Sequence, residues 1–158
     1  MIPFVRRADG VHLAMSSGER GVLTSLTEQL QQVLAGDLAS DPVSARMFPD
    51  AYRDDAEASA EFRRWTGSDL VARKTSNVST VLAWLTGARD GAFDASDEQA
   101  WLRCLTDLRL TIADRLGIVD SATEEQSYTA DAGVGLRDVY DWLGYVQEHL
   151  VETLTAPR

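Results

Sequence analysis

Cysteine is almost absent from this sequence, since Cys104 is the only one among 158 residues. An internal disulfide is therefore impossible, and we expect the chain to fold in a reducing cytoplasm.

Long apolar runs are absent too. The opening residues MIPFVRRADG lack the apolar run of a secretory signal, and no other segment is long and apolar enough to span a bilayer. We therefore expect neither export nor membrane insertion.

Positive charge is scarce, because 15 lysine and arginine residues accompany 25 acidic residues and the net charge is −10. Binding to a phosphate backbone or an anionic membrane requires a basic surface, so this balance argues against nucleic acid and membrane partners. Hydrophobic residues make up 44% of the chain, which is enough for a packed core. Because this length suits one domain, we expect a single domain across residues 1–158.

Residues suited to catalysis or metal binding are few. Histidine occurs only at His12 and His149, which are near opposite ends of the chain. Cys104 falls on an apolar helix stripe, where a packing role is expected. His149 and Glu152 together offer too few ligands for a metal, and no glycine-rich phosphate loop is present. We therefore predict no catalytic residue, no metal and no cofactor, and favour a non-enzymatic protein.

The clearest element that is present is a helix ending at Gly117. Its apolar residues recur at helical spacing on one stripe, namely Trp101, Cys104, Leu105, Leu108, Ile112 and Leu116. Asp94 or Ser96 can cap its start, and Gly117 can close it in the left-handed conformation. The opposite face is polar and carries Arg103, Asp107 and Asp114.

A β-hairpin is predicted at the start of the chain, with short alternating runs at residues 4–7 and 11–15 around the turn Ala8-Asp9-Gly10. His12 alternates with apolar neighbours and is expected to face solvent.

A first helix is then predicted, which Ser16 or Ser17 caps and Gly36 ends. Its apolar stripe, expected to be free of polar residues, is Val22, Leu23, Leu26, Leu30, Val33 and Leu34.

Further helices follow a connector at residues 37–53. A second helix starts at Asp54 or Asp55, and the run at residues 66–69 (TGSD) is expected to interrupt it before a third helix, which ends near Thr86. Residues 118–133 are predicted to be a mobile acidic loop. The last helix covers residues 134–154, and its stripe is Leu136, Val139, Tyr140, Leu143, Val146, Leu150, Val151 and Leu154. The predicted fold is mainly α, a bundle of about five helices with a short N-terminal β-hairpin at residues 1–15.

Polar residues interrupt the apolar faces of several predicted helices. They are Lys74, Asn77, Arg109 and Gln147, with Glu61 and Asp141 as possible acidic partners. Buried polar groups are costly unless hydrogen-bonded, so we expect one polar cluster if these faces meet. Three interpretations stay open. The cluster fixes helix packing, or it lines a pocket for a small anion or a peptide carboxylate, or the side chains extend to solvent.

Several runs along the chain are also typical of a known family. They are Asp41-Pro42, Phe48-Pro49, Tyr52, Glu61-Phe62-Arg63, Thr66, Asp69-Leu70, Lys74, Asn77, Trp101-Leu102, Asp107-Leu108-Arg109-Leu110, Arg115-Leu116-Gly117, Tyr140-Asp141-Trp142-Leu143-Gly144 and Gln147. In combination they resemble an uncharacterised bacterial family labelled domain of unknown function 2017, found mainly in high-GC Gram-positive bacteria. The resemblance covers essentially the whole chain.

The resemblance implies no established activity. Genes of that family often lie near those for an adaptor of the Clp protease, a metalloprotease-like protein and a sulfur-carrier pathway for cysteine synthesis. This neighbourhood favours an accessory or adaptor role over an enzymatic one.

Two functional hypotheses follow from the sequence. The first is an adaptor or regulator that binds another protein through the connector bearing Arg46, Phe48 and Tyr52. A homodimer is also possible. The second is a small-ligand or anion-binding protein, or a small enzyme, that uses the polar cluster inside the bundle.

Overall fold

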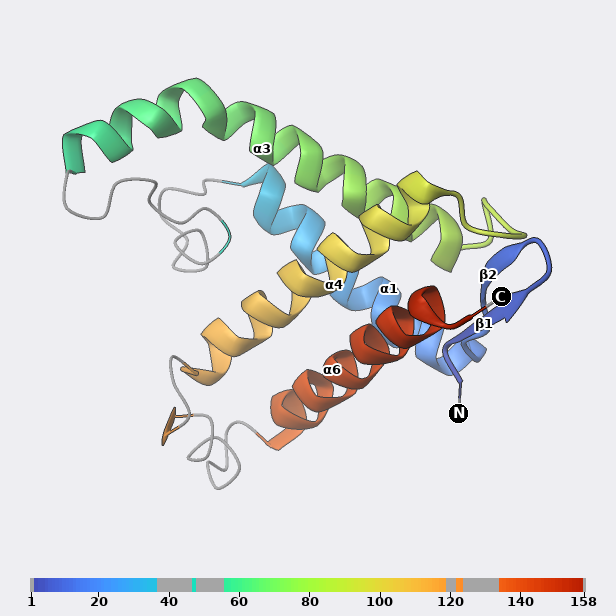
Figure 1. Cartoon of the computed structure of the whole chain (residues 1–158). Coiled ribbons are helices and arrows are strands. Elements are labelled where there is room, and N and C mark those ends of the chain that lie inside the picture. The colour runs from blue at the N-terminus through green and yellow to red at the C-terminus, as the bar shows by residue number, and fades with distance from the viewer. Residues whose placement is uncertain (1, 37–46, 48–55, 119–121, 124–133, 158) are drawn as a thin grey trace.

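The described residues form an N-terminal hairpin followed by four helices (Figure 1). The computed structural model describes residues 2–36, 47, 56–118, 122–123 and 134–157, without the side chains of residues 56–68 and 134. In chain order the elements are β1 (Phe4–Arg7), β2 (Gly10–Leu13), α1 (Ser17–Ala35), α3 (Ala56–Leu85), α4 (Ala95–Leu116) and α6 (Val134–Thr155). The prediction of a mainly helical chain with a hairpin is confirmed.

The hairpin forms where the Asp-Gly turn signal predicts it. β1 and β2 are antiparallel, and Arg7 pairs with Gly10 so that Ala8 and Asp9 form the connecting loop. Gly10 has a φ of 135°, which glycine adopts far more easily than other residues. The expectation that His12 faces solvent is wrong. Its side chain is only 14% exposed, and its Nε2 lies 2.7 Å from Oδ1 of Asp9.

Side-chain caps fix the starts of two helices. The Ser16 hydroxyl accepts a hydrogen bond from the backbone N–H of Glu19, whose side chain in turn accepts from the N–H of Ser16. Asp94 and Asp97 make the same reciprocal arrangement at the start of α4. At the other end of α4, Gly117 adopts a φ of 73°. These caps and the closing glycine were predicted, and they are confirmed.

α3 is one continuous helix of 30 residues. The predicted interruption at residues 66–69 is therefore wrong, and the described chain has four helices rather than about five. A single glycine inside a helix costs only about 1 kcal/mol, and the run contains no proline to remove a backbone donor. The cap-forming residues around Gly67 are thus compatible with an uninterrupted helix.

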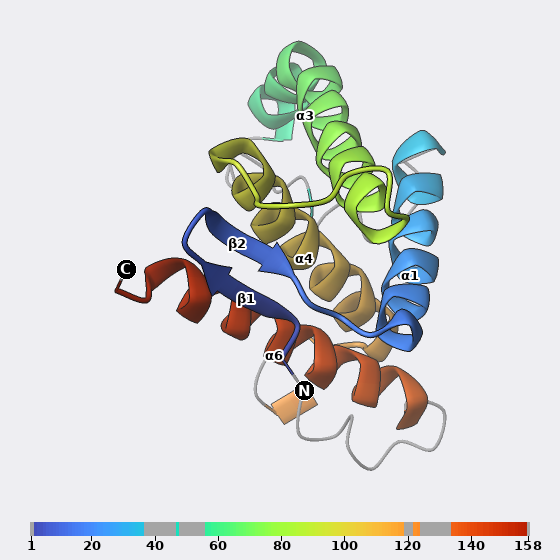
Figure 2. The ribbon, with the colours of Figure 1, turned by 90° about the vertical axis from the view of Figure 1, so that its right-hand side faces the viewer.

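α4 is the central helix of the bundle, because it contacts α1, α3 and α6. Its predicted apolar stripe lies in the core, with Trp101 and Leu105 fully buried. Figure 2 shows the hairpin lying across one end of the bundle, beside α6. There the ring of Phe4 packs edge-on against Trp101 with centroids 5.5 Å apart, and Phe93 stacks on Trp101 at 5.6 Å. The aromatic contacts therefore attach the hairpin to α4.

The predicted stripes of α1 and α6 are each too wide by one residue. Val22 on α1 and Val151 on α6 are exposed, because each lies at the edge of its stripe. Thr27 on α1 is fully buried, contrary to the expectation of a purely apolar face. Its hydroxyl donates to the carbonyl oxygen of Leu23 at 2.7 Å, so the polar group is satisfied inside its own helix.

Candidate functional site

Lys74 on α3 and Asp107 on α4 form an ion pair between two helices. Nζ of Lys74 donates to both carboxylate oxygens of Asp107, at 2.8 and 3.0 Å. The Asp107 side chain is only 4% exposed, and this burial raises the pKa of Asp107, while the hydrogen bond and charge of Lys74 act in the opposite direction. The sequence places Asp107 on the polar face of this helix, opposite the apolar stripe. That position is nevertheless buried, because Asp107 meets Lys74 of α3, which packs against α4.

Arg109 on α4 and Gln147 on α6 form a second, separate polar contact. Nη1 of Arg109 donates to Oε1 of Gln147 at 2.9 Å, and the guanidinium carbon lies 5.3 Å from the centre of the Tyr140 ring. Nε2 of Gln147 donates to the hydroxyl of Thr106 at 2.7 Å. Nε of Arg109 is buried without a hydrogen-bond partner, and no carboxylate of the described residues lies within ion-pair distance of this side chain.

The polar residues expected in one cluster thus belong to two groups. Asp141 does not join Lys74; it is half-exposed and forms an ion pair of 2.9 Å with Arg137, four residues earlier on α6. Asn77 lies partly buried one turn after Lys74 on α3. The side chain of Glu61 lies outside the described residues. Asp107, rather than Glu61 or Asp141, supplies the acid next to Lys74.

A pocket of about 350 Å³ lies between α3 and α4. It is lined by Leu70, Arg73, Lys74 and Asn77 from α3, by Leu102, Arg103, Thr106 and Asp107 from α4, and by Gln147 from α6. The α3 positions are spaced three, four and seven residues from the first, so they share one face of the helix. We call this the cationic pocket, because its described lining residues include three cations and one carboxylate and so carry a formal charge of +2.

A second hollow, of about 620 Å³, lies on the outer side of α6. It is lined by Arg109, Asp141, Gly144, Tyr145, Gln147, Glu148 and Val151. Gly144 lies in the middle of these helix positions and has no side chain to fill the space. A Cβ at Gly144 would lie 3.6 Å from Nη2 of Arg109, so the guanidinium packs directly against the helix backbone. We call this the Gly144 groove.

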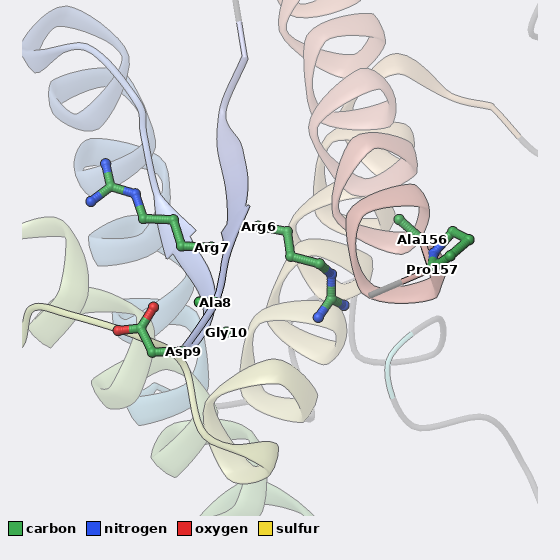
Figure 3. A pocket seen from close by; sticks show the side chains of 7 residues that line it. All are labelled: Arg6, Arg7, Ala8, Asp9, Gly10, Ala156 and Pro157. Atoms are coloured by element: carbon green, nitrogen blue, oxygen red, sulfur yellow. The ribbon is translucent and has the colours of Figure 1, made fainter.

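A third hollow, of about 550 Å³, lies between the hairpin turn and the end of α6 (Figure 3). Arg6 points toward α6 in this view and Arg7 points away from it. Nε and Nη2 of Arg6 donate to the carbonyl oxygens of Thr153 and Leu154, at 3.0 and 2.9 Å. Sequence reasoning missed this contact. The signal was present, because Arg6 shares a strand face with the buried Phe4 and therefore needed a polar partner.

Asp97 closes the loop between α3 and α4 and was also missed. Its side chain is almost fully buried, with Oδ1 accepting from Nε1 of Trp84 at 3.1 Å and from Nη1 of Arg89 at 2.7 Å. Oδ2 accepts from the backbone N–H of Asp94 at 2.9 Å. Because its acceptor positions are occupied, we interpret Asp97 as a structural residue rather than a ligand-binding one.

The family to which this protein belongs is identified from nearly the whole chain rather than from one site. The model of a family described as a domain of unknown function (DUF2017) matches residues 1–154. The chain belongs to the DUF2017 family. No curated protein and no solved structure matches it. The resemblance seen in the sequence motifs is confirmed at the level of the family, and the features described above are those of a DUF2017 fold.

The predicted interface of this DUF2017 member lies outside the described residues. Arg46, Phe48 and Tyr52 all fall in the connector between α1 and α3. Met47 is the one described residue of that connector, and its side chain is buried. The connector therefore has one known anchor in the core, and its role as an interface stays a prediction.

The only thiol of this DUF2017 chain is sealed in the core. Cys104 is buried on α4, and burial raises the pKa of its thiol, so the group stays protonated at neutral pH.

Within the ranges that the structure describes, no three His, Cys, Asp or Glu side chains gather in a way that could hold a metal ion. No helix of those ranges has the length and apolar content needed to cross a bilayer.

Proposed function

We propose that this DUF2017 protein binds another protein, as an adaptor or regulator, and that the Gly144 groove is its contact surface. The observation that carries this proposal is the exposure of Tyr145 and Val151, which are 43% and 45% accessible. They account for two of the four exposed large hydrophobic side chains among the described residues, and both line the groove. Exposed apolar side chains bordered by polar ones are typical of protein-binding surfaces.

The remaining groove residues suit such a contact. Arg109 lies at the edge with one hydrogen bond to Gln147 and no carboxylate partner among the described residues. Tyrosine and arginine are the residue types that most often dominate interface energies. The absence of a side chain at Gly144 lets the Arg109 guanidinium lie against the backbone of α6 within this groove. An acidic residue of the partner would supply the missing counter-ion of Arg109.

Charge and cysteine content favour the setting expected from the sequence. We propose that the protein acts in a reducing cytoplasm, which its single buried cysteine favours. Its origin in a high-GC Gram-positive bacterium is proposed from the family resemblance alone. The net charge of −10 favours a protein partner over a nucleic acid. A second copy of this chain is the other partner to consider.

Site-specific photo-crosslinking in the native host tests the proposal. A crosslinking amino acid replaces Glu148, which is exposed in the groove, and a matched control replaces Glu28, which is exposed on α1. We expect one protein to crosslink from position 148 and not from position 28. With that protein purified, Val151→Asp should weaken binding by roughly tenfold or more.

Two results would change the proposal. A crosslink between two copies of the chain at position 148 would make the groove a homodimer interface. Equal labelling from both positions, or an unchanged affinity in the Val151→Asp protein, would remove the Gly144 groove as the binding surface.

A further inference from the structure

We infer that the cationic pocket between α3 and α4 binds a small organic oxyanion, with the guanidinium groups of Arg73 and Arg103 as its principal ligands. The chemical class is a phosphate ester or a di- or tricarboxylate with a short carbon skeleton. This inference does not depend on the proposed protein contact, because Arg73 and Arg103 line only the cationic pocket, although Gln147 lines both sites.

The first argument is the local charge. Among the described lining residues, the pocket carries Arg73, Lys74 and Arg103 and one carboxylate, that of Asp107, which gives these residues a formal charge of +2. The whole chain has the opposite sign, with a net charge of −10. A concave positive region concentrates anions, whereas the net negative charge of the whole chain repels them. The pocket is therefore where an anion approaching this protein is attracted.

The second argument is that neither arginine has a partner among the residues that the structure describes. Within the described part of the chain, Arg73 and Arg103 make no hydrogen bond and no ion pair, and both are exposed. Other arginines donate to a carboxylate, a carbonyl or an amide oxygen, namely Arg6, Arg20, Arg89, Arg109, Arg115 and Arg137. A guanidinium without a partner presents a planar fork that matches a carboxylate or a phosphate.

The third argument is that the pocket wall is already ordered. Lys74 is held by its two hydrogen bonds to the buried carboxylate of Asp107, so its ammonium does not have to be positioned by the ligand. Asn77 adds an amide one turn further along α3. The positive charge and the polar donors thus come from two helices that are packed against each other.

The apolar part of the lining sets the size and nature of the ligand. Leu70 and Leu102 are partly buried and line the pocket beside the charged groups. Its volume of about 350 Å³ is near the lower end of the range for small-molecule sites, roughly 300–1,000 Å³. An inorganic ion would leave the two leucines without contact, so an anion with a few carbon atoms fits this pocket better.

Calorimetry and thermal unfolding of the full chain test the inference. The probes are glycerol 3-phosphate and citrate, each compared with sodium chloride at equal ionic strength, so that phosphate-ester and carboxylate ligands are distinguished. We expect at least one probe to bind and to raise the melting temperature. In the Arg73→Gln, Arg103→Gln protein the affinity should fall by roughly tenfold or more. The uncharged change Asn77→Leu should also weaken binding.

The matched control removes the same charge elsewhere. Arg7→Gln with Arg115→Gln takes two exposed arginines from the hairpin and α4, outside the cationic pocket, and should leave binding unchanged. The inference is overturned if neither probe binds the wild-type chain. It is equally overturned if the Arg73 and Arg103 substitutions have no effect, or if the control loses as much affinity, because binding would then be nonspecific.

Discussion

Asp107 is a buried acid whose nearest cation, Lys74, comes from another helix, with Nζ 2.8 Å from its carboxylate. The pair lies where α3 meets α4 and forms part of the wall of the cationic pocket. Burial nevertheless outweighs the stabilisation by Lys74, and the pKa of Asp107 is raised. A buried pair of this kind contributes more to the alignment of two helices than to net stability.

The first prediction concerns the titration of Asp107. The pKa of Asp107 in the folded chain is raised above the ordinary value of 3.8, which applies to the unfolded chain. At a pH between the unfolded and the folded pKa, the folded chain holds a proton that the unfolded chain has lost. The stability contributed by this group is therefore fully present below pH 3.8 and is lost as the pH rises through the folded pKa. Lys74→Met should move the midpoint higher still, because Lys74 lowers it. Carboxyl-carbon NMR measures the midpoint.

Two other carboxylates serve as references in the same spectra. Hydrogen bonds from His12 and from the backbone N–H of Asp97 lower the pKa values of Asp9 and Asp94 respectively. Both should titrate below 3.8 in the wild type and in the Lys74→Met protein. A midpoint of Asp107 at or below that value, or one that Lys74→Met leaves unchanged, would contradict the prediction.

The second prediction concerns Asp97. Asp97→Ala removes the acceptor of the buried Trp84 indole N–H and of Arg89, and it also removes half of the capping box of α4. The free energy of unfolding should fall by about 3 kcal/mol. Asp90→Ala, in the same loop but exposed, should change it by less than about 0.5 kcal/mol. Urea unfolding measures both, and equal effects would show that Asp97 is not the residue that closes this loop.

The third prediction concerns the attachment of the hairpin to α6. Arg6→Met removes two charge-assisted hydrogen bonds to the last turn of α6 and should destabilise the chain by about 1.5 kcal/mol or more. Arg7→Met, at the neighbouring exposed position, is the control and should have little effect. Hydrogen exchange at residues 150–155 should become faster only in the Arg6→Met protein. Unchanged exchange there would mean that α6 does not depend on Arg6.

The fourth prediction concerns the floor of the Gly144 groove. Gly144→Ala should raise the free energy of unfolding by roughly 0.5–1 kcal/mol, because alanine is the better helix former and its Cβ makes an ordinary contact with Arg109. Gly21→Ala on α1 should give a similar gain, since nothing lies within 4 Å of its Cβ. Only Gly144→Ala should reduce crosslinking from position 148. A loss of stability would show that Arg109 cannot accommodate the methyl group.

Local signals in the sequence were sufficient for much of this fold. The Asp-Gly turn, the caps at Ser16 and Asp94 and the apolar stripe of α4 all depend on residues close in the chain, and the structure confirms them. The continuity of α3 was not predictable in this way. Cap-forming residues around Gly67 have the same local preferences in a break and in a helix interior, and tertiary packing decides between them.

The candidate site could not be predicted without knowing which helices pack against each other. A hydrophobic stripe identifies one buried face, whereas α4 is covered on several sides and buries Asp107 outside that stripe. A weaker signal was available, because Asp107 recurs at helical spacing with three small residues, Ala100, Thr111 and Cys104 of the stripe, and all four are buried. Arg73 and Arg103 resemble ordinary exposed arginines until α3 and α4 are placed side by side.

The hydrogen bonds from Arg6 to the end of α6 join groups 147 and 148 residues apart in the chain. During translation, at 5–20 residues per second, the hairpin is synthesised roughly 7 to 30 seconds before these carbonyl groups. A two-stranded hairpin is marginally stable alone, so throughout that interval Phe4 has no complete core to enter. The first strand of this protein therefore cannot complete its native contacts until the end of α6 has been synthesised.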